Sequence, residues 1–243
     1  MYRHIPVGSL QKGIDMSLHL GDTAPDFTTE TSTGPIAFHD WAGDEWVVFF
    51  SHPADFTPVC TTELGRVAQL QAEWDKRGVK PIALSVDTNE EHAQWIPDIN
   101  EYNNTTVEYP IIADPDKKVA ELYDMIHPGE GDTSSVRSVF VIDPDKKIRL
   151  TMTYPKSTGR NFDEILRVID ALQEADRGEC ATGVDWQPGD KVIVPPEVPT
   201  AEAKEKFDDV EEHYSYLRAP PASRPTPPAP ALSAAADTAL TCA

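Results

Sequence analysis

One cysteine of the chain stands where a sulfur could react. Cys60 lies in the stretch SHPADFTPVCTTEL, residues 51–64, between an apolar run and a helix-like run. Thr57 followed by Pro58 is a typical helix start, with threonine at the N-cap and proline at the first helical position. Cys60 then falls in the first turn, near unpaired backbone N–H groups and the positive end of the helix dipole. This placement favours the thiolate, the form of sulfur that can attack an O–O bond.

Thr57 supports a reactive rather than an inert Cys60. Its hydroxyl lies one helical turn earlier, within reach of both the sulfur and a bound peroxide. The alternative is an unreactive core cysteine, because free cysteine is among the most buried residue types. The loop, the helix start and the threonine agree with one another, so we expect a reactive sulfur. Disulfide exchange is a second enzyme class, but it normally uses Cys-x-x-Cys, and Thr57 occupies the first of those positions.

The wider sequence strengthens this interpretation. The spacing Pro53-x-x-x-Thr57-x-x-Cys60 resembles the active-site signature of the peroxiredoxins, and SHPADFTPVCTTELGR is similar to their one-cysteine subgroup. Further segments resemble the family's arginine-bearing strand, its following loop and helix, and the start of its C-terminal arm: RSVFVID at 137–143, YPKSTGRNFDEILR at 154–167 and DWQPGD at 185–190. The resemblance extends over residues 17–218.

The resemblance implies a peroxidase mechanism at Cys60. The cysteine attacks the distal oxygen of hydrogen peroxide or an alkyl hydroperoxide, water or an alcohol leaves, and a sulfenic acid remains. Thr57 then orients peroxide and thiolate, and Pro53 limits solvent access. Arg137 binds substrate and supplies positive charge. A permanent cation with fixed donors suits that role, although a surface ion pair is the commonest alternative for an arginine.

Two more residues are candidates for the same pocket. His52 precedes Pro53 in the active-site loop, where a single backbone hydrogen bond is the alternative role. Arg160 precedes a helix, where a helix-start or interface role is the alternative. The resemblance implies neither a metal ion nor a cofactor. Some one-cysteine peroxiredoxins also resemble lipases through Gly-Asp-Ser-Trp-Gly. Here Glu45 replaces the serine nucleophile, so we expect no phospholipase activity by that route.

The sulfenic acid must be returned to a thiol by a second sulfur. Cys242, near the end of the sequence, and Cys180, just after a long helix, are the candidate resolving cysteines. A small buried apolar side chain is the interpretation we favour for Cys180. An external thiol, either thioredoxin-like or of low molecular weight, is then an expected partner. A redox sensor or chaperone-like protein using the same cysteine is the alternative function.

The elements that must position these residues alternate between strand-like and helix-like. Short runs of apolar β-formers predict strands, and apolar spacing near 3.6 residues predicts helices. Their order implies an α/β, thioredoxin-like fold, with a mixed central sheet and helices on both faces. The predicted strands cover 47–50, 81–86, 109–113, 136–142 and 148–154, and the predicted helices cover 59–76, 90–99, 116–123 and 162–175.

Composition limits the partners and the setting. The 243 residues include 41 acidic and 21 basic side chains, a formal net charge of −20. That charge argues against nucleic acid and anionic membrane as partners. Three scattered cysteines, no apolar N-terminal run and no membrane-length apolar run predict a protein of the reducing cytoplasm.

The chain is expected to have four parts. They are an N-terminal extension at 1–16, a peroxidase domain at 17–178, a dimerisation arm at 179–218 and a disordered tail rich in Pro and Ala at 219–243. The arm carries aromatic anchors without clear periodicity. The arm docks either on the chain's own core or on a partner subunit. As in similar proteins, we expect its anchors to be buried against a second subunit, in a homodimer or a larger ring of dimers: Trp186, Phe207, Tyr214 and Tyr216.

Overall fold

The computed structural model describes residues 18–131, 133–207 and 209–220. The predicted N-terminal extension, nearly all of the predicted tail and Cys242 lie outside the described residues. The chain divides into two compact units between Asp170 and Ala171. No helix in the described part of the chain has the length and apolar character needed to cross a membrane.

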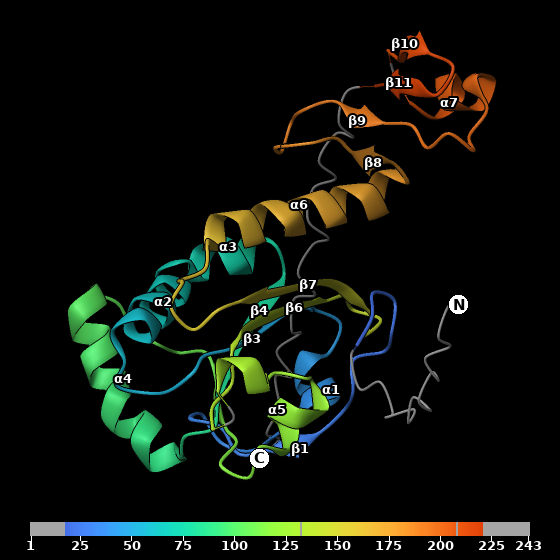
Figure 1. The fold of residues 1–243 in the computed structure, drawn as a ribbon. Helices are drawn as coiled ribbons and strands as arrows, with labels where there is room; N and C mark the ends of the chain where they lie inside the picture. Colours follow the sequence, from blue (N-terminus) through green and yellow to red (C-terminus); the bar gives the residue numbers. More distant parts are fainter. Residues whose placement is uncertain (1–17, 132, 208, 221–243) are drawn as a thin grey trace, which may run out of the picture. The chain divides into compact units, whose positions relative to one another are not determined.

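A five-stranded mixed sheet forms the centre of the first unit (Figure 1). Its central strand runs parallel to one neighbour and antiparallel to the other. The predicted mixed sheet and thioredoxin-like class are therefore confirmed. In sheet order the strands are β5 (Ile111–Ala113), β4 (Val79–Ser85), β3 (Trp46–Ser51), β6 (Arg137–Ile142) and β7 (Ile148–Tyr154), and a separate hairpin pairs β1 (Thr28–Thr29) with β2 (Ile36–Ala37).

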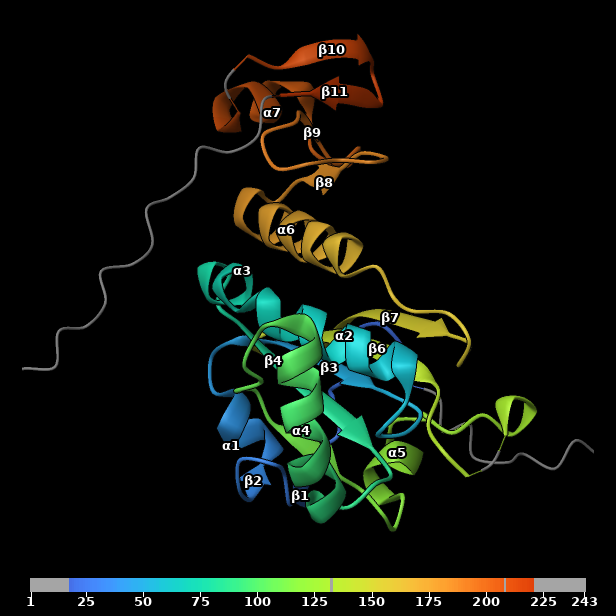
Figure 2. The same ribbon diagram turned by 90° about the vertical axis from the view of Figure 1, so that its left-hand side faces the viewer.

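Helices cover both faces of this sheet. Figures 1 and 2 show α1 and α5 on one side, and α2 and α4 on the other. The helices of the unit are α1 (Phe38–Ala42), α2 (Pro58–Gln69), α3 (Gln71–Lys76), α4 (Asn89–Asn103), α5 (Lys118–Leu122) and the short 3-10 helix η1 (Pro128–Glu130). A longer helix, α6 (Phe162–Gly178), begins in this unit and continues into the second.

Strand β3 shows how the sequence builds the two cores. Because side chains alternate along a strand, Val47 and Phe49 point to one face and Phe50 to the other. Val47 and Phe49 join a fully buried cluster with Phe38 of α1. Phe50 instead contacts the ring of Tyr109, whose hydroxyl donates a hydrogen bond to a carbonyl of α2. The strand is therefore apolar from Trp46 to Phe50, and it ends at Ser51, next to the loop that carries the candidate site.

Several helix boundaries differ from the prediction by a few residues, and two of the differences concern the helices next to the site. The single helix predicted over 59–76 is broken at Leu70, which separates α2 from α3. Helix α4 continues past its predicted end to Asn103. It begins with a capping box between Thr88 and Glu91, and Asn104 ends it in the left-handed conformation. The extra turn of α4 matters because it reaches the first turns of α2.

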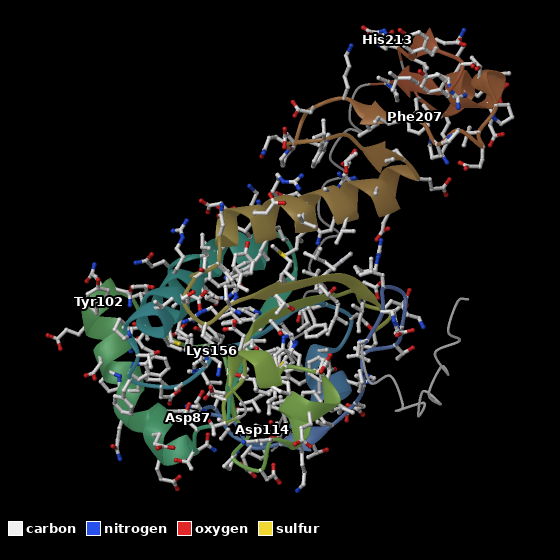
Figure 3. All side chains as sticks on the ribbon, viewed as in Figure 1. Asp87, Tyr102, Asp114, Lys156, Phe207 and His213 are labelled. Atoms are coloured by element: carbon white, nitrogen blue, oxygen red, sulfur yellow. The ribbon has the colours of Figure 1, made fainter. Side chains whose placement is uncertain are left out.

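The second unit is built from short elements after α6. They are β8 (Ala181–Thr182), β9 (Val192–Ile193), α7 (Thr200–Lys206) and the hairpin β10 (Glu211–Tyr214) with β11 (Leu217–Ala219). Figure 3 marks Phe207 and His213 in this region. Arg218 is only 1 % exposed and donates hydrogen bonds to the carbonyls of Val198 and Pro195, at 2.6 and 3.0 Å.

The aromatic anchors predicted for the arm behave differently from one another. Trp186 is buried within its own chain, which agrees with docking on the chain's own core, and its burial needs no second subunit. Tyr214 and Tyr216 are exposed at the hairpin, and their rings stack on each other with centroids 5.3 Å apart.

Candidate active site

Cys60 occupies the first turn of α2 and is completely buried. Thr57 stands at the N-cap and Pro58 at the first helical position, as the sequence indicates. The Thr57 hydroxyl makes no capping hydrogen bond, however, because it donates to the carbonyl oxygen of Ala54 at 2.9 Å. With its proton committed, the Thr57 oxygen keeps its lone pairs as acceptors. Pro53 is buried in the loop just before.

The guanidinium of Arg137 lies against the Cys60 sulfur. Its Nη1 is 3.4 Å from Sγ, although the two residues are 77 positions apart in the sequence. Arg137 begins β6, and it is 2 % exposed. Its Nε and Nη2 both donate to the carbonyl of Lys156, at 3.0 and 2.8 Å. Lys156 follows β7 (Figure 3), so two strands of the sheet fix the direction of the guanidinium.

Glu63 links Arg137 to a second buried arginine. Its Oε2 accepts from Nη1 of Arg137 at 2.6 Å and from Nη2 of Arg160 at 2.7 Å. Its Oε1 accepts from the backbone N–H and Nε of Arg160, at 2.7 and 2.8 Å. Burial alone would raise the pKa of Glu63, but the two guanidinium groups, Arg160 first, hold that pKa below its usual range. Two cations share one carboxylate here, and this leaves one positive charge beside the sulfur.

Arg160 is further held by the ends of two strands. Its Nη1 donates to the carbonyls of Ser51 and Ser138, at 2.8 and 3.0 Å. Its guanidinium also lies over the ring of Phe50, 5.0 Å from the centroid. Arg160 therefore reaches the pocket through Glu63 and supports the geometry of Arg137.

His52 belongs to a neighbouring buried cluster. Its Nε2 lies 2.9 Å from Oδ1 of Asp55, and Oδ2 of Asp55 lies 2.6 Å from Nδ1 of His92. Burial lowers the pKa of His52 and outweighs the opposing effect of Asp55. Burial would raise the pKa of Asp55, but the hydrogen bonds from His52 and His92 hold it at about 2. The carboxylate is thus ionised at neutral pH.

Asp87 completes this cluster and raises the question of a metal ion. Ligand atoms of His52, Asp55 and Asp87 lie within 4.8 Å of one another. Asp87 Oδ2, however, accepts the backbone N–H of Asp55 at 2.9 Å, and both oxygens of Asp55 already face imidazole nitrogens. Hydrogen bonds within the cluster therefore account for its geometry.

The described residues include one of the two other cysteines. Cys180 follows α6 in the second unit, and its thiol lies 3.7 Å from the carbonyl of Glu174. It is 8 % exposed, and burial raises the pKa of its thiol. Both properties suit a small buried side chain better than an attacking thiolate. Cys242 lies outside the described residues.

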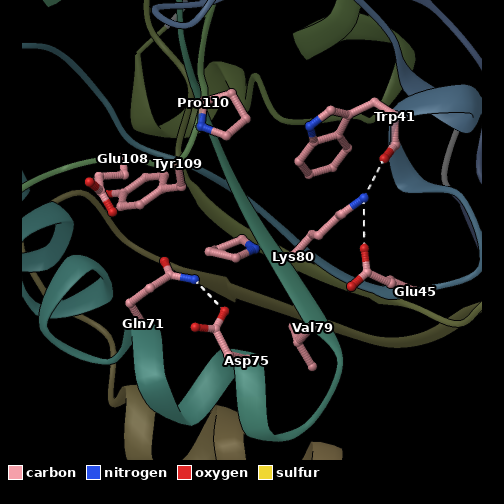
Figure 4. A pocket seen from close by; sticks show the side chains of 10 residues that line it. Trp41, Glu45, Gln71, Asp75, Val79, Lys80, Glu108, Tyr109 and Pro110 are labelled. Atoms are coloured by element: carbon pink, nitrogen blue, oxygen red, sulfur yellow. Dashed lines mark hydrogen bonds and ion pairs between the residues drawn. The ribbon is translucent and has the colours of Figure 1, made fainter. Parts of the chain in front are cut away.

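Two surface hollows lie on the first unit. One of about 420 Å³ borders the start of α2 and is lined by Phe56, Thr57, Pro58, Thr61, Thr62, Trp95, Asp98 and Tyr102. Another of about 370 Å³ lies beside β4 (Figure 4). There Lys80 pairs with Glu45 at 2.7 Å and donates to the carbonyl of Trp41 at 2.8 Å. Glu45, at the lipase-like position, is thus a partner of Lys80.

Sequence reasoning missed three residues that organise the site. Glu63 lies inside the quoted motif one turn after Cys60, and an acidic residue on the buried face of a helix was a usable signal. Asp55 also lies in the motif, and His92 lies on the buried face of α4. Their pairing could not be foreseen, because 37 residues separate Asp55 from His92.

Comparison with known proteins agrees with this site. The model of the AhpC/TSA family matches residues 20–151, and that of the C-terminal domain of 1-Cys peroxiredoxin matches residues 171–209. A 1-Cys peroxiredoxin of Dictyostelium discoideum is 49 % identical over 205 residues, which cover 84 % of this chain and 85 % of the relative.

Two solved structures are similar as well. Peroxiredoxin 6 of Arenicola marina superposes with a TM-score of 0.82 and 44 % identity, covering 86 % of this chain and 100 % of that one. A yeast mitochondrial 1-Cys peroxiredoxin, described with a thiol-resolving mechanism through glutathione/thioredoxin systems, gives 0.81 and 50 %, covering 84 % and 100 %.

A buried cysteine in the first turn of a helix, on a thioredoxin-like sheet, defines a thiol-based redox enzyme. With these matches, the chain belongs to the AhpC/TSA family of peroxiredoxins, which are thiol-dependent peroxidases, and it is similar to members of the one-cysteine subgroup.

Proposed function

We propose that Cys60 reduces hydrogen peroxide and small alkyl hydroperoxides through a sulfenic acid. The observation that carries this proposal is the 3.4 Å contact between its sulfur and Arg137, inside a pocket with one uncompensated positive charge. The Cys60 thiolate forms an S–O bond to the distal peroxide oxygen as the O–O bond breaks. The sulfur loses two electrons, and the leaving oxygen takes a proton and departs as water or an alcohol.

Each neighbouring group has a role that follows from its contacts. Arg137 places positive charge beside the sulfur and binds the negative charge that develops on the peroxide oxygens. Thr57, with its proton donated to Ala54, accepts a hydrogen bond from the peroxide O–H. Pro53 shields the sulfur from water. Arg160 orients Arg137 through Glu63.

The reductant of the sulfenic acid is an external thiol in this proposal. Cys60 is fully buried, so the first turn of α2 must open before another sulfur reaches it. Cys180, with its raised thiol pKa, is a poor resolving residue, and Cys242 remains a candidate. The similar yeast protein is described with glutathione and thioredoxin systems, which supports a thioredoxin-like protein or a low-molecular-weight thiol as the partner.

Peroxide consumption in the presence of glutathione or thioredoxin tests this function. We expect turnover by the wild type, none by Cys60→Ser, and full turnover by Cys180→Ser. Loss of turnover in Cys242→Ser with a normal first oxidation would identify Cys242 as the resolving cysteine. Unchanged consumption by Cys60→Ser would refute the proposal.

The assembly proposed is a homodimer or a ring of dimers. The stacked, exposed Tyr214 and Tyr216 support it, because paired aromatic rings in water are typical of surfaces that a second subunit covers. For the compartment we propose a reducing one, the cytoplasm, since the proposed reaction uses a free Cys60 thiol. The yeast relative is mitochondrial, so cell fractionation has to distinguish the two.

A further inference from the structure

The loop before Cys60 is tied to α4 by a buried carboxylate. Asp55 is 7 % exposed, and each of its oxygens faces one imidazole. The distances are 2.9 Å to Nε2 of His52 and 2.6 Å to Nδ1 of His92. His92 comes from α4, whereas Asp55 and His52 belong to the active-site loop. The Ser85 hydroxyl, 3.4 Å from Oδ1, and Asp87 are the other polar groups around this carboxylate.

The contacts determine where the protons lie. An ionised carboxylate only accepts, so both ring nitrogens that face Asp55 carry hydrogen. The other nitrogen of His92, Nε2, lies 3.2 Å from the carbonyl oxygen of Ile112, which also only accepts. Each ring nitrogen of His92 therefore faces an acceptor, the Asp55 carboxylate at Nδ1 and the Ile112 carbonyl at Nε2. His52 is neutral with its proton on Nε2, and its buried Nδ1 has no partner within the described residues.

One peptide plane connects this hydrogen-bonded pair to Thr57. The N–H of Asp55 and the C=O of Ala54 belong to the same rigid peptide unit. That N–H donates to Asp87 at 2.9 Å, and that C=O accepts the Thr57 hydroxyl at 2.9 Å. His92 holds the side chain of Asp55, and Asp87 holds its backbone N–H. The 54–55 peptide therefore has little freedom to rotate. The direction of the Thr57 lone pairs is fixed as a consequence.

We propose that Asp55 and His92 are positioning residues for the peroxidase reaction of Cys60. The buried hydrogen bond between them holds the 54–55 peptide so that the Thr57 oxygen faces the O–H of the incoming peroxide. Neither residue touches the peroxide. The inference rests on the proposed function, and it adds a residue of α4 to a site otherwise built from α2, β6 and their loops.

Two reactions of Cys60 separate positioning from simple folding. Oxidation by hydrogen peroxide needs Thr57 as an acceptor, whereas alkylation by iodoacetamide has no peroxide O–H to orient. For His92→Leu we expect oxidation about 10- to 100-fold slower, with the alkylation rate within about 3-fold of wild type. His92→Asn keeps an N–H near the place of Nδ1 and should recover most of the oxidation rate. His127→Leu, a histidine outside the cluster, should behave as wild type.

A double-mutant cycle with Thr57→Val tests whether His92 acts through Thr57. If His92 acts through Thr57, His92→Leu should slow oxidation by less than about 3-fold once Thr57 is already valine. Additive effects, or a strong rise in alkylation that shows an opened pocket, would overturn the inference. If His92→Leu does not fold, the same cycle is run with Asp55→Asn. A wild-type protein that consumes no peroxide would instead refute the proposed function and leave this cycle without a signal to measure.

Discussion

At the scale of single residues, the site depends on the balance between its buried positive and negative charges. Arg137 and Arg160 share Glu63, and the remaining positive charge is available to the Cys60 sulfur. A protein with a net charge of −20 would otherwise disfavour another anion. Burying two guanidinium groups is costly unless every donor finds an acceptor. The Lys156, Ser51 and Ser138 carbonyls provide those acceptors.

Arg137→Lys tests the need for a fixed guanidinium. Lysine keeps the charge, but its single ammonium group cannot contact the sulfur, Glu63 and the Lys156 carbonyl at once, as the planar guanidinium does. We expect the rate constant for Cys60 oxidation by hydrogen peroxide, measured by stopped flow, to fall about 100-fold. The matched control Arg149→Lys, at an ion pair with Asp143, should stay within about 3-fold. Equal rates for both variants would mean that charge alone suffices.

The pKa of Asp55 predicts a loss of stability in acid. The carboxyl is held at about 2 against an ordinary 3.8, so it stabilises the folded state above pH 3.8. That stabilisation, about 2 kcal/mol, disappears as the pH falls from 3.8 toward 2. Urea unfolding between pH 5 and pH 2.5 should show a steeper fall of the unfolding free energy for wild type than for Asp55→Asn. Parallel curves would contradict this assignment.

At the scale of elements, the packing of α2 on α4 holds the first turns of α2 in place. Asn103 donates to the Thr61 carbonyl at 3.0 Å, and the Trp95 indole donates to the Thr61 hydroxyl at 3.2 Å. Asn103 lies so close to Gly65 that a Cβ there would come within 2.0 Å of its side chain. Any side chain at position 65 would therefore displace the Asn103 side chain.

Gly65→Ala should separate the two helices. Overpacking of this kind costs about 1–3 kcal/mol, and in a chain of this size each kcal/mol lowers the Tm by about 2–4 °C. We expect a lower Tm by calorimetry and faster alkylation of Cys60, because the turn that buries it loses support. Gly129→Ala is the control, since no atom lies within 4 Å of a Cβ placed there. A Tm equal to that of the control would show that Asn103 can move aside at no cost.

Many of the helices and strands could be predicted from the sequence. The strands around Phe50 and Val139 are short apolar runs of β-forming residues, which are visible without a structure. The break at Leu70 was missed because leucine there fits the apolar spacing of one continuous helix. Arg137 could be assigned from family resemblance. Its link to Arg160 through Glu63 could not, because it depends on tertiary contacts across 74 and 97 residues.

At the scale of the whole molecule, the C-terminal hairpin is the predicted assembly surface. Tyr214 and Tyr216 stack at its exposed end, whereas Trp186 is buried within its own chain. The double variant Tyr214→Ser with Tyr216→Ser should therefore shift the protein toward monomer. Size-exclusion chromatography with light scattering measures this shift. Val184→Ser, an exposed apolar residue of the same unit, should leave the mass unchanged. An unaltered oligomer in the tyrosine variant would place the interface elsewhere.

The most direct test of the account is a single turnover without any reductant. Reduced protein is mixed with equimolar hydrogen peroxide, and a sulfenic-acid trap, intact mass and peptide mapping locate the product. We predict one trapped sulfenic acid per chain, on Cys60, formed at least 100-fold faster in wild type than in Arg137→Lys. Oxidation that appears on Cys180 instead, or that proceeds equally fast in Arg137→Lys, would contradict a reactive sulfur held against Arg137.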